Sequence, residues 1–305
     1  MGSAATARAR SEIVNVASVP QRSPFRYPGG KTWLVPYIRL WLRKSSGPVE
    51  ELIEPFAGGG VAGLTAAFEG LAERVTLVEI DPDVAAVWRT ILSGQGEWLA
   101  EEILSFKLTP ASVRTVLSAP HHSLRERAFA TILRNRVQRG GILAPGAGLM
   151  KNGENGRGIA SRWYPSTIGK RILNILTIKD RITFMQDDGM KWIARNAHRK
   201  EAVYFIDPPY VVAGRRLYRH SQIDHRNLFT LVSRVAGDFL MTYDQNKEIH
   251  ALASEFGFDT HCVPMKNTHH AKMTELLVSR NFDWLRNSAM PQQAFPGFGL
   301  QTLQD

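Results

Sequence analysis

The chain has 305 residues, of which 44% are hydrophobic, a normal value for a globular protein that excludes disorder throughout. The mean hydropathy of -0.20 and the lack of any apolar run of about 18 residues argue against a membrane span. The net charge of +10 and the pI near 9.9 favour a polyanionic partner, nucleic acid first. The single cysteine, Cys262, excludes an internal disulfide and a multi-cysteine zinc site, and it fits a reducing compartment.

Residues 1–23 are small and polar and lack the apolar core of a secretory signal, so we expect a flexible leader. Seven apolar, β-branched runs follow as strand candidates. In chain order they are 50–56, 74–81, 182–188, 202–210, 238–244, 259–265 and 273–281. Most of them are joined by helical patterns such as VAGLTAAFEG and PDVAAVWRTIL. This alternation predicts an α/β fold with a doubly wound sheet.

The alternation breaks between about residues 95 and 171, where helical patterns give way to a Gly-rich, basic stretch. Residues 134–171 hold eight lysines and arginines and one acid, which is +7 of the net +10 within 38 residues. A local basic patch is expected of a nucleic-acid-binding insert, and the alternative is a solvated, mobile loop. The candidates for phosphate or guanine contacts are Arg134, Arg136, Arg139, Lys151, Arg157 and Arg162.

Two motifs follow the first two strands, at the strand ends where a doubly wound sheet binds its ligands. EPFAGGG at 54–60 places glycines between a strand and a helix, so the backbone can approach a ligand closely. It is not a P-loop, because no Lys-Ser/Thr pair follows the glycines. After the second strand, Glu79 suits an acceptor for ribose hydroxyls, whereas Asp81 before Pro82 mainly suits the cap of a helix.

The strongest motif is DPPY at 207–210, which follows a buried strand. Its two prolines restrict the backbone and remove two N–H donors, so carbonyl acceptors remain beside the Asp207 carboxylate. Such a site accepts hydrogen bonds from an amino group and offers the Tyr210 ring for stacking. The alternative is an acidic turn after a buried strand. Near the start, FRYPGGK at 25–31 has a Gly-Gly turn before Lys31, which on its own predicts only a turn.

Together these motifs resemble those of the S-adenosylmethionine-dependent, adenine-specific (N6) DNA methyltransferases, in the Dam-like group whose target-recognition insert precedes DPPY. The resemblance runs from about residue 24 to 282 and rests on the order and spacing of YPGGK (27–31), EPFAGGG (54–60), LVEID (77–81), FMQDD (184–188), DPPY (207–210) and TELLVSR (274–280). The insert departs from the GATC-methylating members at PGAG and NGENGRG, which leaves the recognition sequence open.

The resemblance implies a seven-stranded, Rossmann-like methyltransferase sheet with an antiparallel last strand. It also implies a small, mainly helical insert with a β-hairpin that reads DNA. The expected organisation is a leader (1–23), a catalytic domain (24–94 and 172–285), the recognition insert (95–171) and a tail (286–305).

The resemblance further implies that S-adenosylmethionine is the cofactor. Its expected binding residues are Tyr27, Lys31, Glu54, Phe56, Gly58, Gly60, Glu79, Asp81 and Asp188. The implied catalytic residues are Asp207, Pro208, Pro209 and Tyr210. As a hypothesis, Asp207 and the Pro208 carbonyl accept the two N6–H bonds of a flipped adenine, and Tyr210 stacks on that base. No metal site is expected, because no carboxylate cluster lies near the adjacent His269 and His270.

We therefore expect a site-specific enzyme that methylates adenine in duplex DNA. Three alternatives stay open: methylation of RNA, methylation of a protein glutamine, and a catalytically silent DNA-binding protein. The basic insert favours a long polyanion, and the glutamine group generally has Asn in place of Asp207. The family also implies a bacterial or phage protein in the cytoplasm, associated with the nucleoid. It would be a monomer or weak dimer in restriction-modification, without membrane contact, and any cognate nuclease would be a separate chain.

Overall fold

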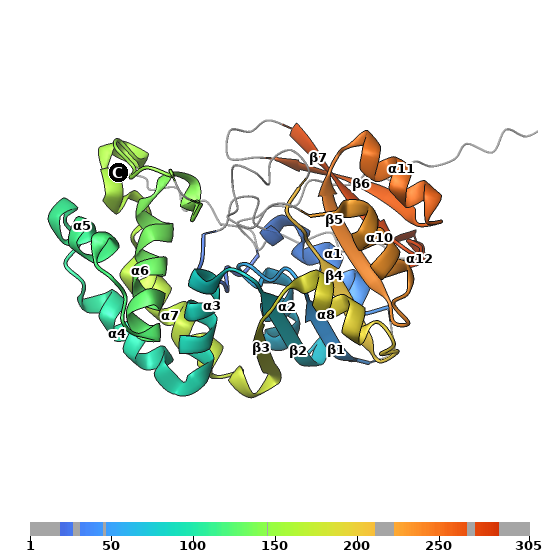
Figure 1. Ribbon diagram of the computed structural model, residues 1–305, viewed down its shortest axis with the longest axis horizontal. Coiled ribbons are helices and arrows are strands. Elements are labelled where there is room, and N and C mark those ends of the chain that lie inside the picture. The colour runs from blue at the N-terminus through green and yellow to red at the C-terminus, as the bar shows by residue number, and fades with distance from the viewer. Residues whose placement is uncertain are drawn as a thin grey trace, which may run out of the picture.

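The computed structural model of the chain describes residues 19–26, 31–44, 47–144, 146–210, 223–266 and 272–286 (Figure 1). The strands are β1 (Val49–Glu54), β2 (Ala72–Glu79), β3 (Ile182–Gln186), β4 (Ala202–Ile206), β5 (Phe239–Asp244), β6 (Asp259–Lys266) and β7 (Lys272–Ser279). The α-helices are α1 (Val35–Leu42), α2 (Val61–Glu69), α3 (Pro82–Thr90), α4 (Gly96–Ser105), α5 (Pro110–Ser118), α6 (Leu124–Val137), α7 (Pro165–Leu176), α8 (Gly189–Asn196), α10 (His225–Ser233), α11 (Lys247–Glu255) and α12 (Asp283–Arg286). Each of the seven predicted strands is therefore confirmed, with ends that differ by a few residues.

All seven strands form one sheet in the order β3-β2-β1-β4-β5-β7-β6. The strands from β3 to β5 pair in parallel, whereas β7 runs antiparallel to both β5 and β6. The parallel strands consequently end at one edge of the sheet. The beginning of β7 lies at that same edge, because Asp244 at the end of β5 pairs with Glu275. The expected doubly wound sheet with an antiparallel strand near one end is confirmed.

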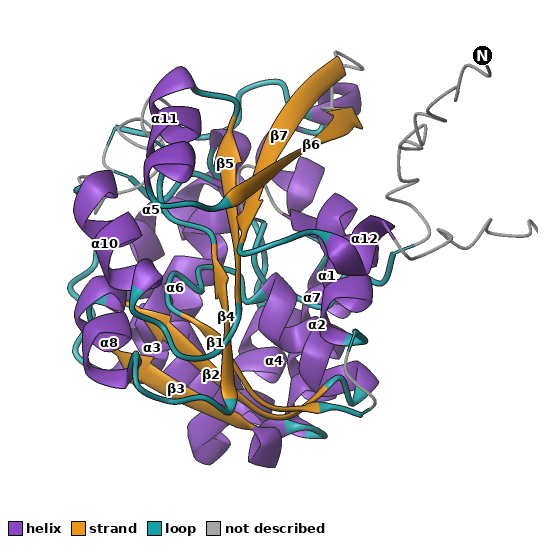
Figure 2. Cartoon of the chain, turned by 90° about the vertical axis from the view of Figure 1, so that its right-hand side faces the viewer, coloured by secondary structure: helices purple, strands orange, loops and turns teal. Residues whose placement is uncertain are grey.

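Two hydrophobic clusters cover the two faces of the sheet. One joins the sheet to α1, α2, α3 and the helices α4 to α7, and the other joins it to α8, α10 and α11. Figure 2 shows α8, α10 and α11 on one side of the strands and α1, α2 and α12 on the other. Successive side chains of a strand point to opposite faces. On β4, Phe205 accordingly enters the first cluster, while Tyr204 and Ile206 enter the second.

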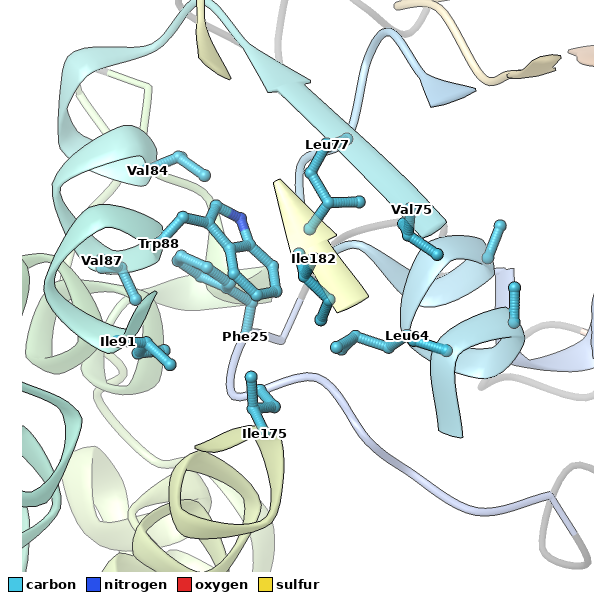
Figure 3. Packing of buried hydrophobic residues seen from close by; sticks show 14 of the residues in the cluster. Phe25, Leu64, Val75, Leu77, Val84, Val87, Trp88, Ile91, Ile175 and Ile182 are labelled. Carbon is cyan, nitrogen blue, oxygen red and sulfur yellow. The ribbon is translucent and has the colours of Figure 1, made fainter. Parts of the chain in front are cut away.

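The helices of residues 95–171 share the first hydrophobic cluster with α3 and the sheet. Figure 3 shows Trp88 of α3 beside Phe25, with Ile175 of α7 and Ile182 of β3 close to them. The chain passes from α3 through the turn Ile91–Gln95 directly into α4, with one interruption at Gly94, whose φ is 86°. Residues 95–171, which include the basic segment 134–171, are therefore anchored on the sheet through a common hydrophobic core.

The β-hairpin expected in this segment is not found in its described residues, 95–144 and 146–171. They contain one isolated bridge, between Gln138 and Leu149, and short 3-10 turns at Arg139–Gly141, Glu154–Gly156 and Gly158–Arg162. Several glycines of this stretch have positive φ, among them Gly140, Gly153 and Gly158. Such a backbone cannot run on as an extended strand, which explains why the stretch forms turns.

Candidate functional site

The carboxyl ends of β1, β2 and β4 bring three predicted site residues to one edge of the sheet. Glu54 is the last residue of β1, Glu79 is the last residue of β2, and Asp207 directly follows β4. These three carboxylates lie close enough for the charges of Asp207 and Glu79 to act on Glu54. The structure thus joins the predicted cofactor motifs and the predicted catalytic motif in one place.

The glycine loop after β1 needs glycine for both backbone angle and space. Gly58 and Gly60 have φ of 47° and 63°, in the left-handed region. The Trp88 indole N–H donates to the Gly58 carbonyl at 2.9 Å, and a Cβ on Gly60 would lie 2.9 Å from the Trp88 ring. A Cβ on Gly189 at the start of α8 would lie 2.1 Å from the Pro55 carbonyl oxygen. The loop is therefore held closely between α3 and α8.

Two carboxylates lie beside this loop in an environment that disfavours their ionised forms. Glu54 is 3% exposed and accepts a hydrogen bond from the Gly63 backbone N–H at 2.8 Å. Glu79 accepts from the backbone N–H groups of Gly58 at 2.9 Å and Asp81 at 2.8 Å. Burial raises the pKa of Glu54 to about 8 and the pKa of Glu79 to about 7. Both carboxylates therefore suit a ligand that brings positive charge or hydroxyl donors.

Asp81 and Asp188 each form the N-cap of a helix at this edge. The Asp81 carboxylate accepts two backbone N–H bonds in the first turn of α3, at 2.8 and 3.4 Å, which confirms its predicted capping role. Asp188 does the same for α8, at 2.8 and 3.2 Å. Phe56 in the glycine loop is partly buried against the second hydrophobic cluster. These contacts fix all three residues around the loop.

A compact group of polar side chains surrounds Asp207. The Lys31 ammonium lies 3.1 Å from Asp207 Oδ1 and 3.1 Å from Glu275 Oε1. The Thr242 hydroxyl also donates to Asp207 Oδ1, at 2.7 Å. Tyr210 accepts a hydrogen bond from Lys31 at 2.5 Å and donates its own hydroxyl hydrogen to Glu275. The side chain of Asp207 is 24% exposed, against 7% for Lys31 and for Glu275, so Asp207 is the carboxylate of this group that a ligand can reach.

The Tyr210 ring is held on one side by its neighbours. Its centre lies 6.2 Å from the Tyr243 ring centre, and the Lys31 ammonium lies 4.8 Å from it. Pro208 is buried and Pro209 is partly buried. The predicted cofactor residue Tyr27 lies outside the described residues. Lys31, which was expected near the cofactor, contacts Asp207 and Tyr210 of the DPPY motif.

Glu275 is a site residue for which the sequence analysis gave no role. It lies on β7, and burial raises its pKa while the Lys31 ammonium lowers it. The signal was a single acid inside the apolar run TELLVS. Its position near Asp207 depends on the antiparallel pairing of β7 with β5, which places Glu275 opposite Asp244.

The basic residues predicted to bind nucleic acid occupy different environments. Arg139, Lys151 and Arg157 are exposed. The Arg157 guanidinium lies 5.9 Å from the ring centre of Tyr164, which is itself 39% exposed. Arg134 is partly buried and pairs with Asp83 at 3.4 Å.

Arg136 requires a correction, because it does not lie on the surface. It is 5% exposed, and its guanidinium donates to the Pro24 carbonyl. The helical periodicity of α6 turns Arg136 to the buried side together with Leu133 and Val137. Its role is to hold the segment before residue 27, and a direct contact with a nucleic acid is not available to it. Arg162 is partly buried and lies near enough to Arg26 for their charges to interact.

Comparison with known families gives one match. Residues 27–110, which are 84 of the 305, match the model of the D12 class N6 adenine-specific DNA methyltransferases. This part of the chain is similar to methyltransferases of that class. The match indicates S-adenosylmethionine as the cofactor and supports an enzyme. It covers the glycine loop, Glu79 and Lys31, and it ends before DPPY and before most of the basic segment.

No curated protein matches the chain. Similar solved structures include an rRNA methyltransferase from Streptomyces viridochromogenes, at 14% identity over 91% of this chain and 97% of that chain, with a TM-score of 0.40. A precorrin-6y C5,15-methyltransferase from Geobacter metallireducens aligns at 9% identity over 80% and 86%, with a TM-score of 0.35. Spermidine synthase from Thermotoga maritima aligns at 9% identity over 83% and 59%, with a TM-score of 0.38. The evidence for the fold is the strand order itself.

The described residues contain neither a candidate metal site nor a membrane-spanning helix. No group of three or more His, Cys, Asp and Glu side chains in this part of the chain is arranged to hold a metal ion. None of its helices is long and apolar enough to cross a membrane.

Proposed function

We propose that this protein is a site-specific DNA methyltransferase that transfers a methyl group from S-adenosylmethionine to N6 of an adenine flipped out of duplex DNA. The observation that carries the proposal is the Asp207 carboxylate, which Thr242 and Lys31 hold at the end of β4. Two prolines and Tyr210 follow it directly. The family match over residues 27–110 and the +7 charge of residues 134–171 support a methyltransferase that acts on a polyanion.

The residues at the strand ends fit the cofactor, which carries a cationic sulfonium, an amino group and ribose hydroxyls. When bound, it supplies an electrophilic methyl group. Glu54 and Glu79 have pKa values raised by burial, so they gain from a cationic or hydroxyl-bearing ligand. The left-handed glycines give the backbone close access to it. We assign cofactor binding to Tyr27, Lys31, Glu54, Phe56, Gly58, Gly60, Glu79, Asp81 and Asp188.

The amino group of adenine is a weak nucleophile, because its lone pair is delocalised into the ring. In the proposed reaction Asp207 accepts one N6–H bond and the Pro208 carbonyl accepts the other. Lys31 and Thr242 both contact Oδ1 of Asp207, so we assign the N6–H bond to Oδ2. These acceptors favour a tetrahedral N6 that gains positive charge, which is stabilisation of the transition state. Once the methyl group is bonded to N6, the surplus N6 proton passes to the Asp207 carboxylate, which leaves neutral N6-methyladenine. Removal of an N6 proton by Asp207 before the attack is disfavoured, because the adenine amino group is too weak an acid to give its proton to a carboxylate.

Tyr210 is proposed to stack on the flipped adenine. Its hydroxyl is fixed by Lys31 and Glu275, so the ring orientation is set before the base arrives. Base–aromatic stacking contributes about 1–3 kcal/mol, and flipping costs a few kcal/mol. Stacking can therefore offset much of the cost of extrusion, which leaves hydrogen bonds to select adenine.

The proposed contacts with DNA come from the basic segment. Arg139, Lys151 and Arg157 are exposed, and Arg157 lies beside the exposed Tyr164. Arginine beside an aromatic ring is a frequent arrangement in nucleic-acid-binding surfaces. Arg134 and Arg162 complete the proposed set. A role in restriction-modification, a separate nuclease and a bacterial or phage cytoplasm stay predictions.

The test is transfer of labelled methyl from S-adenosylmethionine to unmethylated duplex DNA, followed by digestion to nucleosides. We expect the label in N6-methyladenine with the wild type, its loss with Asp207→Ala, and its retention with Asp283→Ala, which removes an exposed carboxylate of α12. Transfer to RNA alone would overturn the DNA substrate. Cofactor binding without transfer to any nucleic acid would favour a silent DNA-binding protein.

A further inference from the structure

A group of arginines gathers around residues 23–26, where the basic segment meets the chain just before Lys31. Arg136 on α6 donates to the Pro24 carbonyl, and Arg171 on α7 donates to the Ser23 carbonyl at 3.1 Å. Arg26 follows at once, and Arg162 ends the turn Gly158–Arg162. We call Arg26, Arg136, Arg162 and Arg171 the arginine cluster.

Asn135 fixes the position of Arg26 within this cluster. It is fully buried, accepts the Arg26 backbone N–H at 2.7 Å and donates to the Arg26 carbonyl at 2.9 Å. Asn135 also donates to the Gly141 carbonyl at 2.7 Å. The main chain of Arg26 is therefore tied to α6, and its partly buried side chain extends from a fixed backbone.

The charges of the cluster are partly buried and repel one another. Burial lowers the pKa of Arg26 and Arg171, and it lowers the pKa of Arg136 to about 9. The charges of Arg171, Arg26 and Arg162 contribute to this lowered pKa of Arg136, after burial, which is the largest cause. Among the residues that the structure describes, no carboxylate forms an ion pair with Arg26, Arg136 or Arg171, and the Arg136 Nε is buried without an acceptor.

Holding two backbone carbonyls does not require such an accumulation of positive charge, because a neutral donor can do the same. Arg26, Arg136 and Arg171 are buried or partly buried and form no ion pair with a described carboxylate, which is costly unless an anion completes the site. Guanidinium groups bind phosphate oxygens through paired N–H bonds, so phosphate is the anion that this cluster suits best.

We propose that Arg26 and Arg171 bind one backbone phosphodiester of the nucleic acid, with Arg136 beneath them and Arg162 beside them. This inference rests on the proposed function and adds a contact that the basic stretch alone does not indicate. The cluster positions the substrate and does not read its bases.

The position in the chain limits where this phosphate lies. Arg26 is five residues before Lys31, and five residues span at most about 18 Å. Lys31 contacts Asp207. Phosphates of one strand follow each other every ~3.4 Å along the duplex axis. The bound phosphodiester therefore lies near the target adenine, and it fixes the duplex while the base leaves the stack.

The first experiment compares binding of unmethylated duplex DNA by the wild type, Arg26→Gln, Arg171→Gln and the double variant in a salt titration. Glutamine removes the charge and keeps a polar, unbranched side chain, and thermal unfolding checks that the fold is preserved. Each lost phosphate contact lowers the slope of log K against log salt by about one unit. We expect a slope lower by about one in the double variant, because both arginines bind the same phosphodiester, and an unchanged slope in Arg234→Gln, which alters an exposed arginine after α10.

The second experiment locates the phosphate with duplexes that each carry one uncharged methylphosphonate. Wild-type affinity should fall at one position near the target adenine, and the double variant should be indifferent to that position. A double variant with the wild-type salt slope and the wild-type response to every methylphosphonate overturns the inference. Suppose that the double variant has a lower salt slope but that the wild type forms no N6-methyladenine. The proposed function then fails, while the phosphate site stands. A wild type that does not bind duplex DNA overturns both.

Discussion

The site around Asp207 and the arginine cluster differ in how buried charge is compensated. At the sheet edge, the Lys31 ammonium lies 3.1 Å from both Asp207 and Glu275, so a cation of the protein itself offsets part of the carboxylate charge. In the arginine cluster, backbone carbonyls hold Arg136 and Arg171, and the cations face one another. Arg26 in the arginine cluster and Lys31 at the sheet edge are five residues apart in the sequence.

This difference indicates what each region needs from a ligand. The edge around Asp207 is organised before any ligand binds, as expected for groups that must align a reacting atom. No described carboxylate forms an ion pair with Arg26, Arg136 or Arg171, so we expect an anionic ligand to compensate these three charges. Changes at the edge should therefore alter the chemical step, and changes in the cluster should alter substrate binding.

The largest expected effect comes from Asp207→Asn. The amide keeps the shape of the side chain, but it loses the negative charge that stabilises a developing positive N6. We expect the single-turnover rate of methyl transfer to fall about 10³-fold, with DNA and cofactor affinity nearly unchanged. Rapid-quench measurement of N6-methyladenine checks this. A rate within about tenfold of wild type would remove Asp207 from the chemistry.

Lys31→Met sharpens the comparison, because it removes the cation that balances the edge. The pKa of Glu275, which burial raises and Lys31 lowers, should rise further. A raised carboxyl pKa means that a higher pH is needed to ionise the group, so the acid limb of the rate profile should move to higher pH. We expect a loss of about 10²-fold at neutral pH that is partly recovered at high pH.

The matched control for this variant is Lys44→Met, which removes a partly exposed lysine that pairs with Asp238 away from the site. Its pH–rate profile should equal that of the wild type. If Lys31→Met also keeps the wild-type profile, the ammonium has no part in holding the carboxylates.

Glu54→Gln tests the cofactor side of the same edge. The pKa of Glu54 is about 8 without ligand, so the carboxyl is mostly protonated at neutral pH. A cationic cofactor favours the ionised form, so wild-type affinity should rise as the pH increases towards about 8, by up to about tenfold per pH unit. Calorimetric titration with S-adenosylmethionine should show a flatter pH dependence in Glu54→Gln. Glu50→Gln, which changes an exposed glutamate, should keep the wild-type dependence.

The same substitution has a predictable effect on stability. The folded-state pKa of Glu54 is raised from 4.5 to about 8, so the folded state holds a proton that the unfolded state releases. Between these values the free energy of unfolding of the wild type should decrease as the pH rises. Glu54→Gln should lack this contribution, which urea unfolding at several pH values measures. An equal pH slope in both proteins would contradict the assignment.

The smallest expected effect is that of Asn135→Ala in the arginine cluster. It removes the three hydrogen bonds that tie Arg26 and Gly141 to α6, and we expect a loss of about 2 kcal/mol of stability. Duplex affinity should fall only a few-fold, because Arg26 loses its fixed backbone but keeps its charge. Cofactor affinity should not change, and a large loss of cofactor affinity would show that the two regions are not separable. The control is Asn196→Ala, which removes an asparagine hydrogen bond to the Trp192 carbonyl on α8 and should leave duplex affinity unchanged.

Features of the fold that depend on neighbouring residues were predictable from the sequence, whereas features that depend on backbone angles of glycines were not. Short apolar, β-branched runs predicted all seven strands, and the runs are most continuous in β4 and β5, whose residues are almost all buried on both faces of the sheet. The cap at Asp81 was also predictable, since a cap involves only neighbouring residues. Of the expected β-hairpin, the described residues show one antiparallel bridge, between Gln138 and Leu149, and a Gly-rich stretch does not reveal which angles its glycines take.

By itself, the sequence determined the strands, the helices between them and the edge of the sheet at which the motifs EPFAGGG and DPPY meet. These features follow from local periodicity and from the rule that parallel strands end together. Only the tertiary structure decided that Lys31 reaches Tyr210, 179 residues away, and that Glu275 joins them. It also buried Arg136 and gathered the arginine cluster. Such contacts depend on strand pairing and helix packing between distant segments, which no local pattern encodes.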